Sequence, residues 1–325
     1  MKPAGTNVAA GFLISFTGAV LFSTKAILVK LAFRNTQADG VTLLALRMLL
    51  SLPFYLLTAL WGSRQSGNVR MKPAQWAWVI GLGLLGYYLS SLFDFIGLQY
   101  ISAGLERLIL FLYPSFAVLI NSMLFGQRIS RAQALALVLS YTGIGIAYFG
   151  ELRIDTGNPH FYWGSFLIFL CSITYACYLS GAGRMVPVLG AAKFTTYSML
   201  TATIGVLTHF FVRQAIGGHA PLPTGPGSGQ LWGYGLALAL LATVIPSFMM
   251  SAGMRRIGAN NAAIVTSVGP VSTILQAHFI LGDPIFAEQL LGTVLVIVGV
   301  LLIGWKSAKP VGEAPEVVEE AASIK

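Results

Sequence analysis

Residues 97–146 read GLQYISAGLERLILFLYPSFAVLINSMLFGQRISRAQALALVLSYTGIGI, and 156 positions further on residues 253–302 read GMRRIGANNAAIVTSVGPVSTILQAHFILGDPIFAEQLLGTVLVIVGVLL. Outward from these stretches, the same ungapped shift pairs Trp76 with Trp232 and Ser91 with Ser247. The other matched pairs are Gly97 and Gly253, Ile101 and Ile257, Ala103 and Ala259, Pro114 and Pro270, Gly126 and Gly282, Ile129 and Ile285, Gln133 and Gln289, and Gly143 and Gly299. Leucine matches arise by chance in an apolar chain, whereas Trp, Pro and Gln matches in one frame do not. The chain is therefore predicted to consist of two related halves.

The composition excludes a water-soluble protein. Hydrophobic residues make up 56% of the 325 residues, charged residues only 10%, and the mean hydropathy is +0.76. A soluble domain carries about 25% charged residues. A chain this apolar cannot cover a surface that faces water, so lipid must be its solvent over most of its length. The 36 glycines agree with this, because small residues let helices approach closely in a bilayer.

The net charge of +9 does not indicate a nucleic-acid-binding protein. Such proteins gather their basic residues in one patch or stripe. Here the basic residues stand singly or in pairs between apolar runs, so membrane topology explains them better and no nucleic-acid partner is expected.

Ten segments are apolar and long enough to cross a bilayer, which takes about 20 residues per helix. They fall near residues 8–31, 40–61, 75–98, 103–125, 131–150, 162–183, 193–215, 231–254, 259–281 and 286–305. Residues 217–230 are rich in Gly and Pro and are expected to form an irregular loop. The tail, residues 306–325, carries four glutamates and is expected to be disordered and cytoplasmic.

The positions of Lys and Arg predict the orientation of these spans. Alternate connections carry twelve Lys and Arg residues on one side of the membrane and four on the other. Since the side richer in positive charge faces the cytoplasm, both termini are placed there, in a multi-pass protein of the cell inner membrane. Each half, residues 8–150 and residues 160–305, holds five spans. An odd number inserts the second half with opposite polarity, which gives the inverted-topology repeat of many secondary transporters.

The two quoted stretches make the chain resemble the drug/metabolite transporter superfamily, in particular its EamA type with two five-helix repeats. The family pattern has a Pro midway along the fourth helix of each repeat and, twelve residues later, a Gly usually followed by Glu. In this chain that position holds Gln127 in the first half and Asp283 in the second. The resemblance implies ten helices and alternating access. No cofactor is expected. The resemblance leaves the substrate open among amino acids, other metabolites, nucleotide sugars and drugs.

Five charged residues lie at least three residues from either end of their predicted spans, all in the first half: Lys25, Arg47, Asp94, Glu106 and Arg107. Each costs about 2.5–3.5 kcal/mol at a helix centre, so each needs a partner or a function. The predicted topology places all five in the outer half of the membrane, where they can meet. Three interpretations remain open: a structural ion-pair network, direct contact with the substrate, and coupling to a proton or another ion. Three cations against two carboxylates leave one positive charge over.

Neighbouring side chains favour a lined cavity with a flexible wall. Tyr87 and Ser91 stand at helical spacing from Asp94, and Tyr113 is predicted to share a face of its helix with Glu106 and Leu110. Pro114 and Pro270 lie near the bilayer midplane of equivalent helices, where each removes a backbone hydrogen bond. They are interpreted as helix breaks or hinges.

The sequence favours transport over catalysis. It contains no GxxxxGK[ST] phosphate-binding motif, and no helix carries two metal-ligand residues at a suitable spacing. A fixed cation in the first span, Lys25, repels cationic drugs and attracts carboxylates or phosphates. The expected function is export of amino acids or related anionic or zwitterionic metabolites. Phosphate-linked metabolites or drugs are the nearest alternative, and a membrane-embedded lipid-modifying enzyme or a sensor is the alternative from another class.

Overall fold

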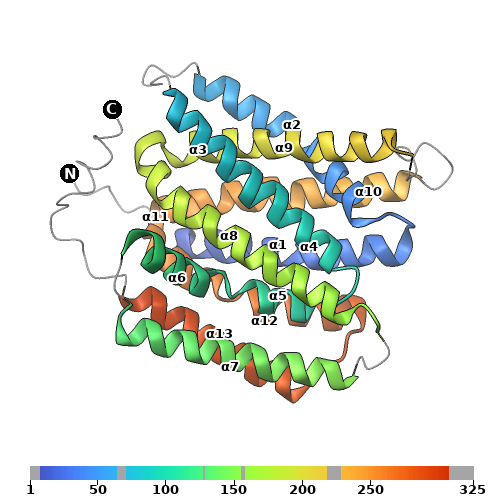
Figure 1. The fold of residues 1–325 in the computed structure, drawn as a ribbon, viewed down its shortest axis with the longest axis vertical. Coiled ribbons are helices and arrows are strands. Elements are labelled where there is room, and N and C mark those ends of the chain that lie inside the picture. The colour runs from blue at the N-terminus through green and yellow to red at the C-terminus, as the bar shows by residue number, and fades with distance from the viewer. Residues whose placement is uncertain (1–7, 64–70, 127–128, 155–157, 218–227, 307–325) are drawn as a thin grey trace.

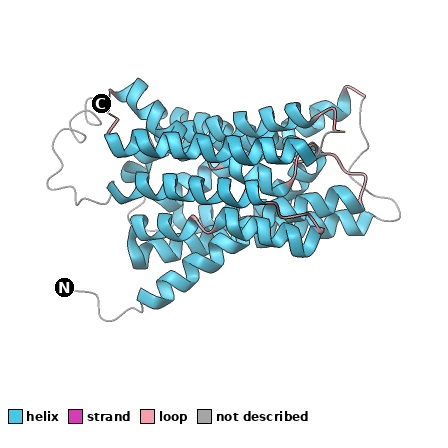
Figure 2. Cartoon of the chain, turned by 90° about the horizontal axis from the view of Figure 1, so that it is seen from below, coloured by secondary structure: helices cyan, strands magenta, loops and turns pink. Residues whose placement is uncertain are grey.

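The computed structural model describes residues 8–63, 71–126, 129–154, 158–217 and 228–306. All regular structure in these residues is helical, as Figure 2 shows, and none of them forms a strand. Gln127, most of the predicted loop at residues 217–230 and nearly all of the predicted tail at residues 306–325 lie outside the described residues.

The first half begins with two long helices, α1 (Val8–Asn35) and α2 (Gly40–Ser63). Next comes one continuous helical run made of α3 (Pro73–Gly83), the π-helical turn η1 (Leu84–Leu89) and α4 (Ser90–Gly97). Two shorter helices and a long one complete this half: α5 (Ala103–Leu110), α6 (Tyr113–Phe125) and α7 (Arg131–Ile154).

The second half follows the same plan. It begins with α8 (Phe161–Leu189) and α9 (Ala191–Ala215). The next run is again interrupted by a π-helical turn: α10 (Ser228–Ala239), η2 (Leu240–Val244) and α11 (Ile245–Thr266). The half ends with α12 (Gly269–Gln276), a third π-helical turn η3 (Ala277–Leu281) and α13 (Ala287–Lys306).

Seven helical runs of the described chain are long and apolar enough to cross a membrane, and Ala287–Leu302 is a shorter apolar helix. The seven runs are Ala9–Asn35, Gly40–Gly62, Pro73–Gly97, Ala103–Leu124, Arg131–Arg153, Phe161–Leu189 and Ser228–Met254. The chain is thus a multi-span membrane protein. The predicted span at residues 193–215 is helical as α9, but it is less apolar than these runs because it includes Lys193, His209 and Arg213.

The predicted ninth span, residues 259–281, was wrong in its first part. Residues 259–266 continue α11, and the helix is interrupted only at Ser267–Val268. In the first half, Ser102 starts a new helix because its hydroxyl accepts a hydrogen bond from the Leu105 N–H. The equivalent position in the second half is Gly258, which has no side chain to form such a cap.

Backbone features recur at the interval of 156 residues. The π-helical turns η1 and η2 begin 156 residues apart, at Leu84 and Leu240. The breaks at Phe111–Leu112 and Ser267–Val268 also correspond. The helices after these breaks end at Gly126 (φ 63°) and Gly282 (φ 76°), where glycine tolerates the left-handed conformation. The turn η3 has no counterpart in α6.

The close contacts of α1 and of α8 with their neighbouring helices also correspond between the halves. For these two helices the equivalent residues are 153 positions apart. A Cβ atom at Gly11 would meet Arg256 and Ile257, and one at Gly164 would meet Tyr100 and Ile101, their counterparts at the 156-residue shift. The backbones of α1 and α11 therefore approach as those of α8 and α4 do. By this register Lys25 corresponds to Tyr178.

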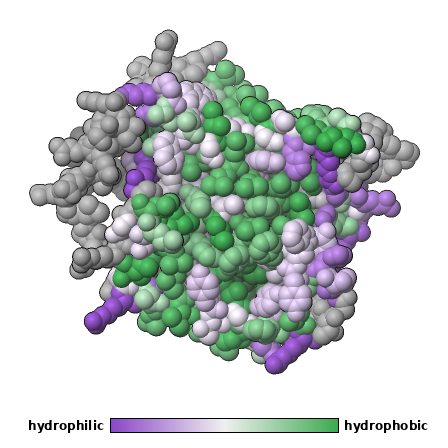
Figure 3. Space-filling model, in the orientation of Figure 1, coloured by the Kyte–Doolittle hydropathy of each residue, from purple (hydrophilic) through white to green (hydrophobic). Residues whose placement is uncertain are grey.

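The helices run lengthwise beside one another, and α7 and α13 pack side by side in Figure 1. A Cβ atom at Gly143 of α7 would lie 2.6 Å from the Gly292 carbonyl oxygen of α13, so this contact needs glycine. Figure 3 shows apolar side chains across the middle of one face and polar ones toward the helix ends. The start of α1 and the end of α13 lie at the same end of the molecule (Figure 1). We refer to the opposite end as the far end.

Candidate functional site

A buried ion triad joins three helices of the first half. The Lys25 Nζ atom of α1 lies 2.7 Å from Asp94 Oδ2 of α4 and 3.2 Å from Glu106 Oε1 of α5. The side chain of Lys25 is 15% exposed, that of Asp94 3% and that of Glu106 0%. One ammonium group therefore serves two carboxylates that are largely withdrawn from solvent.

Local structure brings the two carboxylates together. Asp94 lies in the last turn of α4 and Glu106 in the first turn of α5, and the short turn between these helices reverses the chain. The Ser102 cap fixes the start of α5. A carboxylate in the first turn is also favoured by the helix dipole. Lys25 then reaches both acids from the neighbouring α1.

Arg47 contacts neutral groups rather than a carboxylate of the described residues. Its Nε atom donates to Thr243 Oγ1 of η2 at 2.8 Å, and its Nη1 atom donates to Ser91 Oγ at 3.5 Å. Its guanidinium carbon lies 5.5 Å from the centre of the Phe95 ring. Because Thr243 belongs to the second half, Arg47 connects the two halves near the triad.

Arg107 lies at the broken helices of both halves. Its guanidinium carbon is 5.3 Å from the centre of the Phe111 ring, at the break between α5 and α6. The group also packs against Gly269, where a Cβ atom would lie 3.2 Å from the guanidinium carbon. The Nε atom is buried without a hydrogen-bond partner among the described residues.

The site carries a net positive charge and unused hydrogen-bonding atoms. Lys25, Arg47 and Arg107 face only two carboxylates, and Lys25 alone forms ion pairs with both. Asp94 Oδ1 and Glu106 Oε2 are buried without a hydrogen-bond partner in the described part of the chain. Such atoms are costly unless something pairs with them. The arrangement therefore offers both donors and acceptors to a bound molecule.

Tyrosines of α8, which the sequence alone does not single out, extend the site. The Tyr178 hydroxyl donates to the Tyr87 hydroxyl at 2.9 Å, and the Tyr113 ring lies 5.1 Å from that of Tyr175. The rings of Tyr175 and Tyr178 stack 5.8 Å apart. The sequence feature that could have identified Tyr178 is its correspondence with Lys25. That correspondence needs a shift of 153 residues, so the ungapped shift of 156 residues does not reveal it.

Glu106 and Tyr113 lie on two helices where the sequence predicts one, because the chain breaks at Phe111–Leu112 between α5 and α6. Pro114 follows this break as the second residue of α6, and Pro270 is the second residue of α12 after the equivalent break. Proline lacks the N–H that would continue the preceding helix, so it suits the first turn of a new one.

At the far end, polar contacts link the two halves. Arg34 donates to the Leu281 carbonyl at 2.5 Å and to Asp283 Oδ1 at 3.0 Å. Asp39, in the loop between α1 and α2, pairs with Arg213 of α9. Burial opposes the charge on Asp39, but hydrogen bonds from Thr42 and Arg213 hold its pKa below the ordinary value. Asp283, in the loop between η3 and α13, thus forms an ion pair with Arg34 of α1.

Comparison with known proteins agrees with this architecture. The sequence profile of the EamA-like transporter family matches residues 9–149 and 162–305. The chain belongs to this family. The EamA-like chain is 30% identical to the uncharacterized transporter YcbK of Bacillus subtilis over 292 residues, 88% of this chain and 90% of YcbK. It is 25% identical to an uncharacterized transporter of Synechocystis sp. over 334 residues, which covers 92% of this chain and 94% of that protein.

A solved crystal structure shares the fold of this EamA-like protein. The two superpose with a TM-score of 0.60 at 19% identity, covering 93% of this chain and 99% of the other. The family and the relatives point to membrane transport as the general function.

Proposed function

We propose that the protein is a secondary-active transporter of ten membrane helices in two inverted five-helix repeats, and that it exports amino acids or related anionic or zwitterionic metabolites by alternating access. It would lie in the cell inner membrane with both termini in the cytoplasm. The excess of Lys and Arg in alternate connections supports this orientation. The recurrence of η1 in η2 and of both helix breaks supports the repeat.

The excess positive charge of the site is the observation that favours an anionic or zwitterionic substrate. Arg107 and Arg47 make no ion pair within the described residues, so a carboxylate of the substrate would supply the missing negative charge. A guanidinium binds a carboxylate through two parallel hydrogen bonds. The unpartnered oxygens of Asp94 and Glu106 would accept hydrogen bonds from an amino group. A zwitterion matches both sets of atoms.

The broken helices supply the moving parts of the proposed mechanism. Arg107 packs on Phe111 at one break and against Gly269, next to Pro270, at the other. A substrate held by Arg107 would therefore bias the arrangement of both breaks at once. Discontinuous helices around a central site are typical of transporters with inverted repeats.

A proton is the coupling ion that the triad would accommodate best. Asp94 and Glu106 both bind one ammonium group, so their nearest oxygens lie within about 6 Å of each other. The Lys25 ammonium favours the ionised form of both carboxylates while it contacts them, and without it two carboxylates this close disfavour each other's ionisation. Uptake of a proton when Lys25 moves away, and its release when Lys25 returns, would link protonation to the conformational cycle.

Binding to purified protein tests the substrate class. We expect amino acids and small carboxylates to bind, and quaternary ammonium compounds to bind much more weakly. Arg107→Met should abolish binding of carboxylates. Arg256→Met should not, because Arg256 is an exposed arginine of α11 that lies beside Gly11, fourteen residues before Lys25 on α1. Tight binding of quaternary ammonium compounds with none of carboxylates would refute the assignment. Phosphate-linked metabolites would use the same cations, and competition by inorganic phosphate distinguishes them.

A further inference from the structure

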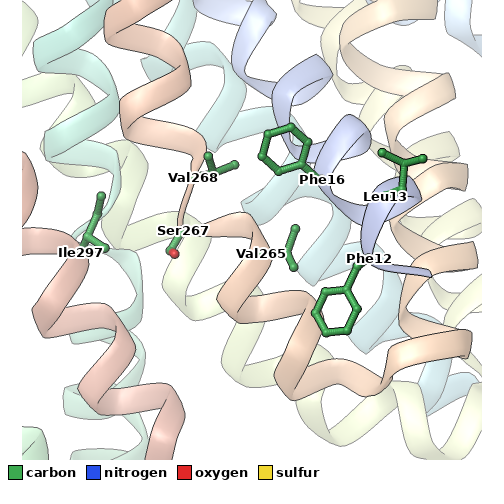
Figure 4. A pocket seen from close by; sticks show the side chains of 7 residues that line it. All are labelled: Phe12, Leu13, Phe16, Val265, Ser267, Val268 and Ile297. Carbon is green, nitrogen blue, oxygen red and sulfur yellow. The ribbon is translucent and has the colours of Figure 1, made fainter. Parts of the chain in front are cut away.

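An apolar groove opens beside the α11–α12 break, next to Gly269, which packs against Arg107 of the charged site. It has a volume of about 570 Å³ and is lined by side chains of α1, the α11–α12 break and α13. Figure 4 shows these side chains, which are Phe12, Leu13, Phe16, Val265, Ser267, Val268 and Ile297. Ser267 is the one polar member. The volume falls within the range of about 300–1,000 Å³ that is typical of ligand sites.

The groove faces the surroundings of the helix bundle. Phe12 is 39% exposed, Leu13 65% and Phe16 48%. These residues belong to a membrane span, so their exposed surfaces face the hydrocarbon of the bilayer. Water gains no hydrogen-bond partners from such a lining, and apolar cavities stay dry.

The first half provides an internal control, because its equivalent position is filled. There the Phe116 ring lies 5.3 Å from the Phe169 ring and 6.3 Å from the Tyr141 ring. At the repeat shifts, Phe169 corresponds to Phe16 of the groove. Phe116 corresponds to Ser272, Tyr141 to Ile297 and Phe111 to Ser267.

Loss of aromatic volume therefore explains the groove. Three rings of the first half, Phe111, Phe116 and Tyr141, correspond to two serines and an isoleucine in the second half. One ring is gained, because Phe12 stands where the first half has Ser165, so the net change is a loss of aromatic volume. The helices around the position keep the same arrangement, because close contacts such as those of Gly11 and Gly164 are shared. The groove lies on the outside of the bundle, where the hydrocarbon of the bilayer covers apolar surface, so an apolar group from outside the chain would complete the packing there.

We propose that the groove is a binding site for one acyl chain of a membrane lipid. The hydrocarbon outside Phe12, Leu13 and Phe16 supplies that chain at high local concentration. The bound chain would take the place that the Phe116 ring fills in the first half and would contact the α11–α12 break next to Pro270. The site is independent of which solute the protein transports.

Photo-crosslinking of the full-length protein in lipid vesicles tests the site. The vesicles consist of phosphatidylethanolamine and phosphatidylglycerol, with a small fraction of a phosphatidylcholine that carries a diazirine on its acyl chain. We expect crosslinked peptides to be several times more abundant at residues 12–16 and 265–268 than at their first-half counterparts, 165–169 and 109–112. Equal labelling of the two halves would mean ordinary lipid contact only and would overturn the proposal.

Reciprocal substitutions between the halves sharpen this test. Ser272→Phe should fill the groove and lower its labelling severalfold, and Phe116→Ser should open the counterpart and raise the labelling of the first half. Ile297→Tyr should narrow the groove from α13 and lower its labelling in the same way. This variant replaces Ser272→Phe in the test if Ser272→Phe does not fold. Labelling that no folded variant changes would also overturn the proposal.

Discussion

Replacing Lys25 with Met isolates the energy of the ion triad. The substitution keeps an unbranched side chain of similar length and removes the single ammonium group that lies 2.7 Å from Asp94 and 3.2 Å from Glu106. Both carboxylates are at most 3% exposed, so water cannot replace the lost partner without a rearrangement. Removing one partner of a buried ion pair costs about 3–5 kcal/mol. Since about 1.4 kcal/mol corresponds to a factor of ten, the folding equilibrium should shift by two to more than three powers of ten.

A triple variant separates stability from mechanism. Lys25→Met combined with Asp94→Asn and Glu106→Gln leaves no uncompensated charge in the triad, so most of the lost stability should return. Transport should stay abolished, because the proposed proton site and the gate are gone. Thermal unfolding in nanodiscs and uptake into proteoliposomes measure the two properties on the same preparations.

Two results would refute this reasoning. A stability of Lys25→Met within about 0.5 kcal/mol of the unmodified protein would mean that the triad is not buried, because surface substitutions have effects of that size. Transport by the triple variant at the unmodified rate would remove the three charges from the mechanism.

Three further predictions concern other parts of the molecule. Arg107→Gln should raise the KM of an anionic substrate at least tenfold in a proteoliposome assay, while a neutral analogue is little affected. The Asp39–Arg213 pair should stabilise the protein at neutral pH, because the folded-state pKa of Asp39 lies below its unfolded value of 3.8. This stabilisation should disappear as the pH falls below 3.8 and through the folded-state pKa of Asp39. Asp39→Asn should remove this part of the pH dependence of the free energy of unfolding. Gly143→Val should cost about 1–3 kcal/mol, because its Cβ would lie 2.6 Å from a carbonyl oxygen of α13, whereas the control Gly145→Val has open space and should be nearly neutral in unfolding experiments.

The sequence predicted the helical membrane fold because apolar length is a local property. Each long apolar run is helical over most of its length, although those at residues 103–125 and 259–281 are broken. The ungapped shift of 156 residues located the equivalent breaks before Pro114 and Pro270. The start of the ninth span was missed since it depends on one capping residue. Ser102 provides that cap in the first half, and Gly258 cannot.

The site was predictable only in its charges. Lys25, Asp94 and Glu106 stand out because ionised groups are rare in spans, and the structure brings them together. Tyr175 and Tyr178 do not stand out, since tyrosines in an apolar run usually serve packing. Their place beside Tyr113 and Tyr87 depends on the register of α8 against the first half, which differs from the main repeat shift by three residues.

The paired π-helical turns bear on the history of the protein. A π turn holds one residue more than a regular helical turn and arises most simply by a single-residue insertion into a helix. The turns at Leu84–Leu89 and Leu240–Val244 begin 156 residues apart, at the same point of the repeat. One insertion in an ancestral half, followed by duplication of its gene, would account for both. On that account the backbone irregularity was inherited by each copy, whereas the intramembrane charges diverged.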